Sequence, residues 1–326
     1  MSRIGKVTLD GIRTDAQFDL TARYDAFCDA MDSDVDDSPF TNNPNKCEYY
    51  EPTNFEKKLD ESAINGGNHS RSYFHLNCRG LSANWEQFRD LICDLHSDNF
   101  SFDFIGISEV FRCDRDQRIS LPGYHTIITR VRELHDDYRG GVALFIKDSL
   151  DFKIRDDLSV FIPHVFESLF IEVESESGKP TIVGVIYRPN TAPRSDIDIF
   201  TTTLLDLMDK VNNEKKTGVI MGDMNIDLLK FDIHDGTNAY LDNIFSRVFL
   251  PLILKPTRIC ASTASLIDHM FTNNIIETSF SGIIITDVAD HFGTFYITKN
   301  KKTVRKYTEQ HIRSFSEKNI NSFKTI

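Results

Sequence analysis

Several features are missing from this sequence of 326 residues, and each absence excludes a class of protein. No apolar run reaches the roughly eighteen residues that a transmembrane helix needs, so no membrane partner is expected. The opening segment, MSRIGKVTLDGIRTD, lacks the apolar core of a secretory signal; we therefore expect an intracellular protein, nuclear or cytoplasmic, that is not secreted. The 6 cysteines are scattered without a C-x-x-C pair, which argues against a disulfide framework or a zinc site.

Three common catalytic signatures are absent as well. The sequence contains no Gly-rich P-loop, no G-x-S-x-G elbow and no H-E-x-x-H motif. Nucleoside triphosphate hydrolysis, serine hydrolysis and zinc proteolysis therefore lack their usual residues, and no small organic cofactor is expected.

Positive charge is scarce except near the end of the sequence. The formal net charge is −12, and only the segment 299–326, with 8 basic and 2 acidic residues, is basic. A protein that held nucleic acid by charge alone would be basic. A phosphate substrate would therefore have to meet local cationic side chains or a metal ion.

The composition changes twice along the chain. Residues 1–70 carry 7 basic and 14 acidic residues and include the Asp-, Asn- and Pro-rich stretch 29–46, so we expect an acidic, disordered leader. Residues 71–298 have the hydrophobic patterning of one folded domain. Residues 299–326 form a basic tail that we expect to be a linker, truncated before a further domain.

Short strand-like runs dominate the central segment. About ten runs are solidly apolar or alternate apolar with polar residues, at 72–77, 102–109, 124–131, 140–147, 167–173, 181–188, 218–223, 265–272, 282–286 and 292–298. Helical periodicity separates some of them, at 84–98, 198–213 and 238–249. This pattern predicts an α+β fold, a four-layer sandwich of two packed mixed β-sheets flanked by helices.

Polar residues recur where these runs end. A single Asn or Asp after a strand is usually a turn or cap residue, and Tyr187 by itself is typical of a half-buried strand. Asp268 is different because it lies within an apolar run, and a buried carboxylate needs a partner such as histidine. We expect such residues to lie together at one rim of the sandwich. They are Asn77, Glu109, Tyr187, Arg188, Asp223, Asn225, Asp268, Asp290 and His291.

Taken together, these side chains suit metal-assisted hydrolysis of a phosphate ester. Mg²⁺ prefers carboxylate and other oxygen ligands together with substrate phosphate. A bound metal offsets charge that develops on the phosphoryl oxygens, and an oriented carboxylate or histidine activates water.

Eight sequence blocks also resemble a known family when they are taken in order. HLNCRGL, IGISE, RGGVALFI, GVIYRPN, MGDMNIDLL, KPTRI, SLIDHMFTN and ADHFG resemble the endonuclease/exonuclease/phosphatase superfamily. More narrowly, they are similar to the apurinic-type endonuclease domain of non-LTR (LINE-type) retrotransposons. The resemblance covers residues 72–298 and implies a DNase-I-like fold.

The resemblance implies a metal site and its ligands. Glu109 would be the principal ligand with Asn77 beside it, and Asp290 would lie near the metal or the leaving group. The implied metal is Mg²⁺, with Mn²⁺ as the alternative, and the implied partner is the DNA phosphodiester backbone. In such elements a reverse transcriptase follows on the same polypeptide.

The resemblance also implies catalytic roles. Asp223, helped by Asn225, would orient or deprotonate the attacking water. His291, paired with Asp268, would contact the scissile phosphate, and Tyr187 would hydrogen-bond one of its oxygens. Arg188, Thr257 and Arg258 would bind the substrate.

Two positions depart from the family pattern. Ala289 stands where Ser usually precedes the final Asp-His pair, which removes a supporting hydroxyl. Arg79 stands where the repair enzymes have a second acidic residue, which favours the retrotransposon branch and removes one metal ligand. The expected function is a Mg²⁺-dependent endonuclease that nicks DNA at a target site. The alternatives are a phosphomonoesterase of the same superfamily and a catalytically inactive retroelement remnant.

Overall fold

The computed structural model describes residues 47–62, 69–111, 119–128, 140–174, 179–190, 194–260, 263–274 and 279–299. The expectations for residues 1–46 and for the tail from residue 300 onward lie outside these ranges. No helix in the described ranges is long and apolar enough to cross a bilayer.

The first sheet has seven strands in the order β1-β15-β16-β2-β3-β5-β4. It is mixed: β2 and β3 run parallel, as do β1 and β15, and the other neighbours are antiparallel. Its strands are β1 (Glu48–Tyr50), β2 (His69–Asn77), β3 (Phe104–Ser108), β4 (Tyr124–Ile128), β5 (Val142–Lys147), β15 (Ser279–Ile284) and β16 (Gly293–Lys299).

The second sheet also has seven strands, in the order β11-β14-β10-β9-β8-β6 with β7 paired to β8. The neighbours β9 and β10 are parallel, and the other pairs are antiparallel. Its strands are β6 (Phe152–Ile154), β7 (Phe161–Ile162), β8 (Phe166–Val173), β9 (Thr181–Tyr187), β10 (Thr217–Asp223), β11 (Leu250–Pro251) and β14 (Asp268–Thr272). A separate hairpin pairs β12 (Arg258–Ile259) with β13 (Ala264–Ser265).

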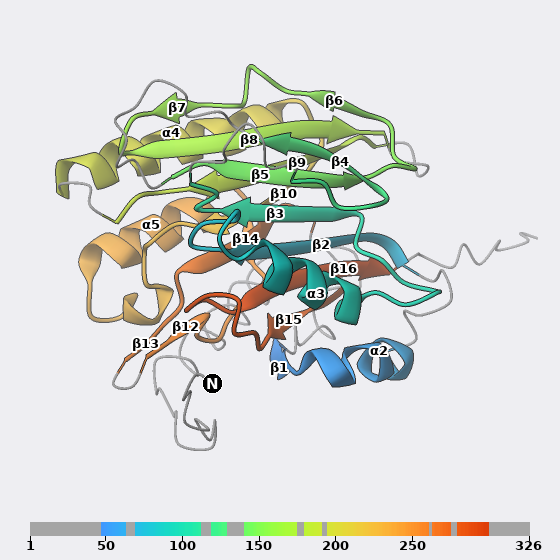
Figure 1. The fold of residues 1–326 in the computed structure, drawn as a ribbon. Helices are drawn as coiled ribbons and strands as arrows, with labels where there is room; N and C mark the ends of the chain where they lie inside the picture. Colours follow the sequence, from blue (N-terminus) through green and yellow to red (C-terminus); the bar gives the residue numbers. More distant parts are fainter. Residues whose placement is uncertain are drawn as a thin grey trace, which may run out of the picture.

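Four helices in the described residues complete two outer layers (Figure 1). They are α2 (Pro52–Glu61), α3 (Trp85–Leu95), α4 (Arg194–Asn213) and α5 (Asp235–Phe245), with a 3-10 turn η3 at Leu228–Lys230. Apolar side chains of α2 and α3 share one core with the outer face of the first sheet, and those of α4 and α5 belong to a second core with the second sheet. Period-two alternation in β2 shows the layering, because Phe74 and Leu76 face the helices while Tyr73 packs between the sheets. The predicted four-layer sandwich is confirmed.

The predicted boundary at residue 70 does not hold for residues 47–62. β1 adds a parallel strand beside β15, and α2 buries Phe55 and Leu59 against the first sheet. The Tyr49 hydroxyl donates to the carbonyl of Pro256 at 2.9 Å, which ties this segment to the loop before β12. Burial of two large apolar side chains outweighs the polar composition of the surrounding leader.

The topology brings the predicted polar residues to one rim. The parallel pair β2 and β3 ends at Asn77 and Ser108, and the parallel pair β9 and β10 ends at Tyr187 and Asp223. Asn77 touches Asp223 across the two sheets, so the carboxyl ends of all four strands meet. A site built there rests on strands of the central layers.

Candidate active site

Asp223 ends the buried strand β10 and points between the two sheets. Gly222 makes this possible, since a Cβ there would lie 1.8 Å from the carbonyl oxygen of Ile186 on the neighbouring strand. Asn77 donates its Nδ2 to Oδ2 of Asp223 at 2.8 Å, and the backbone N–H of Asn225 donates to Oδ1 at 2.9 Å. Both carboxylate oxygens are therefore oriented, and neither has a cationic hydrogen-bond donor among the described residues.

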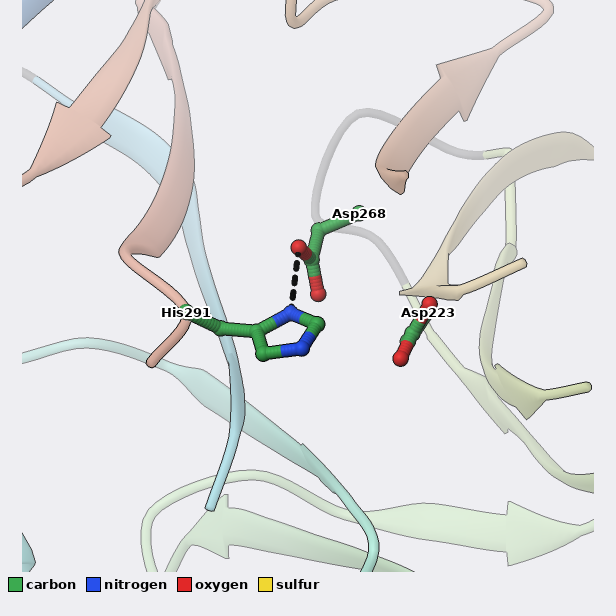
Figure 2. Close-up of side chains that lie close together, drawn as sticks. All are labelled: Asp223, Asp268 and His291. Atoms are coloured by element: carbon green, nitrogen blue, oxygen red, sulfur yellow. Dashed lines mark hydrogen bonds and ion pairs between the residues drawn. The ribbon is translucent and has the colours of Figure 1, made fainter. Parts of the chain in front are cut away.

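A histidine-carboxylate pair faces Asp223. Nδ1 of His291 lies 2.8 Å from Oδ2 of Asp268, so the predicted pairing of these two residues is confirmed. Figure 2 shows the imidazole of His291 joined to Asp268, with the carboxylate of Asp223 to one side of this pair. Asp268 is fully buried, and it also accepts the hydroxyl of Thr257 at 2.6 Å.

The three groups shift one another's proton affinity. Burial raises the pKa of Asp223 well above its ordinary range, and the nearby charge of Asp268 raises it further. Burial opposes protonation of His291, but the charge and hydrogen bond of Asp268 outweigh it and raise the pKa of His291 to about 9. The same pair lowers the pKa of Asp268 despite its burial. Near neutral pH the site thus holds an imidazolium-carboxylate pair beside a carboxyl group that binds a proton more tightly than usual.

Glu109 and Tyr187 form a second part of the rim. Glu109 follows β3 with a left-handed backbone (φ 54°), a sparsely populated conformation for a non-glycine residue. The Tyr187 hydroxyl donates to Oε1 of Glu109 at 3.1 Å. Burial, followed by the charges of Glu109 and Asp223, raises the pKa of Tyr187, so this hydroxyl remains a donor.

Asp290 is held by two arginines. Arg258 donates Nε and Nη2 to Oδ2 of Asp290 at 3.0 and 2.6 Å, and Nη1 of Arg79 lies 3.4 Å from Oδ1. Burial acts to raise the pKa of Asp290, but the Arg258 hydrogen bonds prevail and lower it. Arg79, which departs from the family pattern, thus brings a second guanidinium to the predicted ligand Asp290.

Two predicted substrate contacts have other partners. The buried guanidinium of Arg188 donates to the carbonyls of Met224 and Asn225 at 2.6 and 2.5 Å, and Asn225 returns a bond from Nδ2 to the carbonyl of Arg188 at 2.7 Å. Arg188 therefore fixes the loop after Asp223. Thr257 is fully buried on Asp268, so its hydroxyl faces that carboxylate and not the rim.

The sequence interpretation did not single out His75 and Ser108. His75 is fully buried between the sheets, with Nε2 2.8 Å from the Ser108 hydroxyl and Nδ1 4.0 Å from Oδ1 of Asp268. Burial lowers its pKa to about 4, so the ring is neutral. A signal was present, since the alternation of β2 places His75 on the same face as Asn77.

The donor atoms fit a divalent cation at this rim. Asp223, Asp268 and His291 offer ligand atoms within 4.8 Å of one another, but Nδ1 of His291 is already bound to Asp268. Glu109 and Asn77 offer only oxygen, the donor type that Mg²⁺ prefers. The cation would also offset the charge that raises the pKa of Asp223.

Comparisons with known proteins agree with this geometry. Residues 74–291 match the sequence model of the Endonuclease/Exonuclease/phosphatase family. No curated protein matches the sequence.

Solved structures of diverse function share the fold. The endonuclease domain of TRAS1, a telomere-specific non-LTR retrotransposon, is similar with 12% identity and a TM-score of 0.50, over 70% of this chain and 98% of that one. A 3'-5' exonuclease from Neisseria meningitidis is similar with 14% identity and a TM-score of 0.52, over 70% and 100%. A mannosyl-6-phosphatase from Bacteroides thetaiotaomicron is similar with 15% identity and a TM-score of 0.50, over 71% and 100%. At these identities the likeness concerns the fold alone.

Proposed function

The chain belongs to the endonuclease/exonuclease/phosphatase family of phosphoester hydrolases, and from that premise we propose that it is a Mg²⁺-dependent endonuclease that nicks DNA. The observation that carries the proposal is the rim itself, where an oriented Asp223 faces the His291–Asp268 pair across a gap of a few ångströms. A phosphodiester bound there would lie between a proton acceptor and a proton-bearing cation.

Asp223 is the general base in this proposal. The pKa of Asp223 is raised toward neutral pH. A general base works best when its pKa lies near the operating pH, because it then accepts and releases a proton readily. The bonds from Asn77 and from the backbone N–H of Asn225 hold the carboxylate, so one oxygen can receive a proton from water while the other stays fixed.

His291 contributes a positive charge at the scissile phosphate. Asp268 keeps the ring protonated and holds its Nδ1, which leaves the other nitrogen to donate to a phosphoryl oxygen. Thr257 fixes Asp268 from behind. A donor that is oriented before the reaction stabilises developing charge at little reorganisation cost.

Glu109 and Asn77 are the proposed metal ligands, with Mn²⁺ as the alternative to Mg²⁺. A bound divalent cation supplies charge neutralisation on the phosphoryl oxygens and the leaving group. The Tyr187 hydroxyl donates to Glu109 and orients it, and in this proposal the same hydroxyl would also bond a phosphoryl oxygen. Asp290 would lie near the metal or the leaving group, and it is paired with Arg79 and Arg258.

DNA is favoured over a small phosphate ester by two features. The blocks RGGVALFI, YRPN and KPTR resemble those of non-LTR retrotransposon endonucleases. Arg258 and Arg79 also place cationic groups at the rim of an otherwise acidic protein, where a continuous phosphate backbone would pass. In this proposal the nick provides a primer end for a reverse transcriptase of the same element.

Matched substrates test the choice between diester and monoester. Supercoiled plasmid, bis-p-nitrophenyl phosphate and p-nitrophenyl phosphate would each be incubated with the full chain in Mg²⁺ and in EDTA. The proposal expects Mg²⁺-dependent conversion of plasmid to the open circle with little release from the monoester. Rapid monoester hydrolysis with intact plasmid would replace it with the phosphomonoesterase alternative, and inertness toward all three would favour the inactive remnant.

A further inference from the structure

His75 is fully buried and has no part in the proposed chemistry. It belongs to β2, in the first sheet, and its side chain enters the space between the two sheets with no exposed surface. Its closest polar neighbours come from two other strands. Ser108 ends β3 directly before Glu109, and Asp268 begins β14 in the opposite sheet.

Two buried polar atoms lie near each other at this point. Nδ1 of His75 and Oδ1 of Asp268 both lack a hydrogen-bond partner among the described residues, and they lie 4.0 Å apart. The other oxygen of Asp268 is already shared by Thr257 and His291. A buried carboxylate oxygen without a donor is costly, and the imidazole of His75, with Nδ1 4.0 Å away, can supply one.

The Ser108 hydroxyl can donate to Nε2 at 2.8 Å, or to the carbonyl of Ile186 at the longer distance of 3.5 Å, and the choice sets which nitrogen of the ring carries the proton. A neutral imidazole has one N–H, and Ser108 lies 2.8 Å from Nε2. If Nε2 carried the proton, Nδ1 would present a lone pair to the lone pairs of Asp268 within the buried core. If the Ser108 hydroxyl donates to Nε2, the proton resides on Nδ1 and points at Oδ1 of Asp268.

We infer that His75 is a positioning residue for the phosphate-binding histidine, with its Nδ1–H directed at Oδ1 of Asp268. Asp268 then lies between two imidazoles, His75 on one oxygen and His291 on the other. The arrangement fixes the plane of the carboxylate, and therefore the orientation of His291. It also connects Asp268 through Ser108 to the strand end that carries Glu109.

Two conservative variants separate this role from simple filling of the core. In His75→Asn the amide nitrogen occupies the place of Nδ1 and keeps a donor toward Asp268. In His75→Gln the amide reaches the place of Nε2, so the contact with Ser108 is kept and the donor toward Asp268 is lost. The inference rests on the proposed function for its kinetic readout.

Steady-state nicking would give kcat and KM for each variant, with thermal unfolding as a check on the fold. We expect His75→Gln to lower kcat by about 10-fold to 100-fold with little change in KM, as is usual when a group that orients an active-site ligand is lost. His75→Asn should stay within about 3-fold of the parent, which is smaller than the weakest such effect. Equal losses in both variants, or a loss that follows only the unfolding temperature, would overturn the inference.

A second measurement does not depend on nuclease activity. Long-range ¹⁵N–¹H spectra of histidine-labelled protein distinguish the two neutral tautomers, and His75→Gln identifies the resonance. The expected result is the Nδ1–H tautomer at His75, and the Nε2–H tautomer would overturn the inference even in an active enzyme. Absence of plasmid nicking together with the Nδ1–H tautomer would instead count against the proposed function alone.

Discussion

Replacing Asp268 by Asn removes one charge from the site and keeps its shape. The amide oxygen can still accept from Thr257 and from Nδ1 of His291, whose distances to the carboxylate are 2.6 and 2.8 Å. The negative charge that keeps His291 protonated is lost. Burial then dominates, and the pKa of His291 should fall from about 9 toward its ordinary value of 6.5.

The expected loss of activity in Asp268→Asn can be worked out from this change in the pKa of His291. The whole difference between about 9 and 6.5 corresponds to roughly 3 kcal/mol, at about 1.4 kcal/mol for each pKa unit. If the proton of His291 stabilises the transition state, kcat at pH 8 should fall by about 30-fold, because the protonated fraction of His291 drops from about nine-tenths to about 3% when its pKa moves from about 9 to 6.5. The alkaline limb of the rate profile, which lies near the pKa of His291, should move to lower pH by up to the same difference.

Plasmid nicking as a function of pH and NMR titration of the His291 ring measure the two effects separately. Asp209→Asn is the matched control, since Asp209 pairs with Arg247 in a half-exposed ion pair away from the rim. The reasoning is refuted if Asp268→Asn folds, shows a lowered pKa at His291 and still nicks DNA at the parent rate. It is equally refuted if the pKa of His291 does not move.

Three further changes probe other parts of the molecule. Tyr187→Phe removes the hydroxyl that donates to Glu109, and steady-state nicking should show kcat lowered by about 10-fold, the worth of one hydrogen bond to a charged group. Arg258→Ala removes a cation from the rim. In fluorescence anisotropy, the slope of log Kd for DNA against log salt concentration should become shallower by about 1. An unchanged slope would contradict a contact between Arg258 and a phosphate. Phe55→Ala should cost about 3–5 kcal/mol in denaturant unfolding, while Lys57→Ala, on the exposed side of the same helix, should cost almost nothing.

Much of the fold could be predicted because its strands are strongly patterned. The long runs that became β2, β8, β9 and β10 have the apolar texture of buried strands. The short strand β1 could not be predicted in this way. It has three residues without alternation, and its partner β15 lies more than two hundred residues further along the chain.

The site was predictable as a set of residues and less so as a set of contacts. The cost of burying a lone carboxylate predicted that Asp268 has a partner, and the family resemblance implied that this partner is His291. The contacts of Arg188 could not be predicted, because a long side chain can reach either a substrate or a nearby backbone carbonyl. Only the path of the loop after Asp223 decides between the two. His75 shares a strand face with Asn77, but its relation to Asp268 depends on how the two sheets are stacked.

Nicking of supercoiled plasmid by the full chain and by Asp223→Asn tests the central claim most directly. The parent should convert the plasmid to the open circle in Mg²⁺ and leave it intact in EDTA. Asp223→Asn, which keeps the shape of the side chain but cannot accept a proton from water, should lose at least about 100-fold, the lower range for general-base catalysis. A variant that nicks as fast as the parent would contradict the account, and so would a folded parent that binds DNA and Mg²⁺ without cutting.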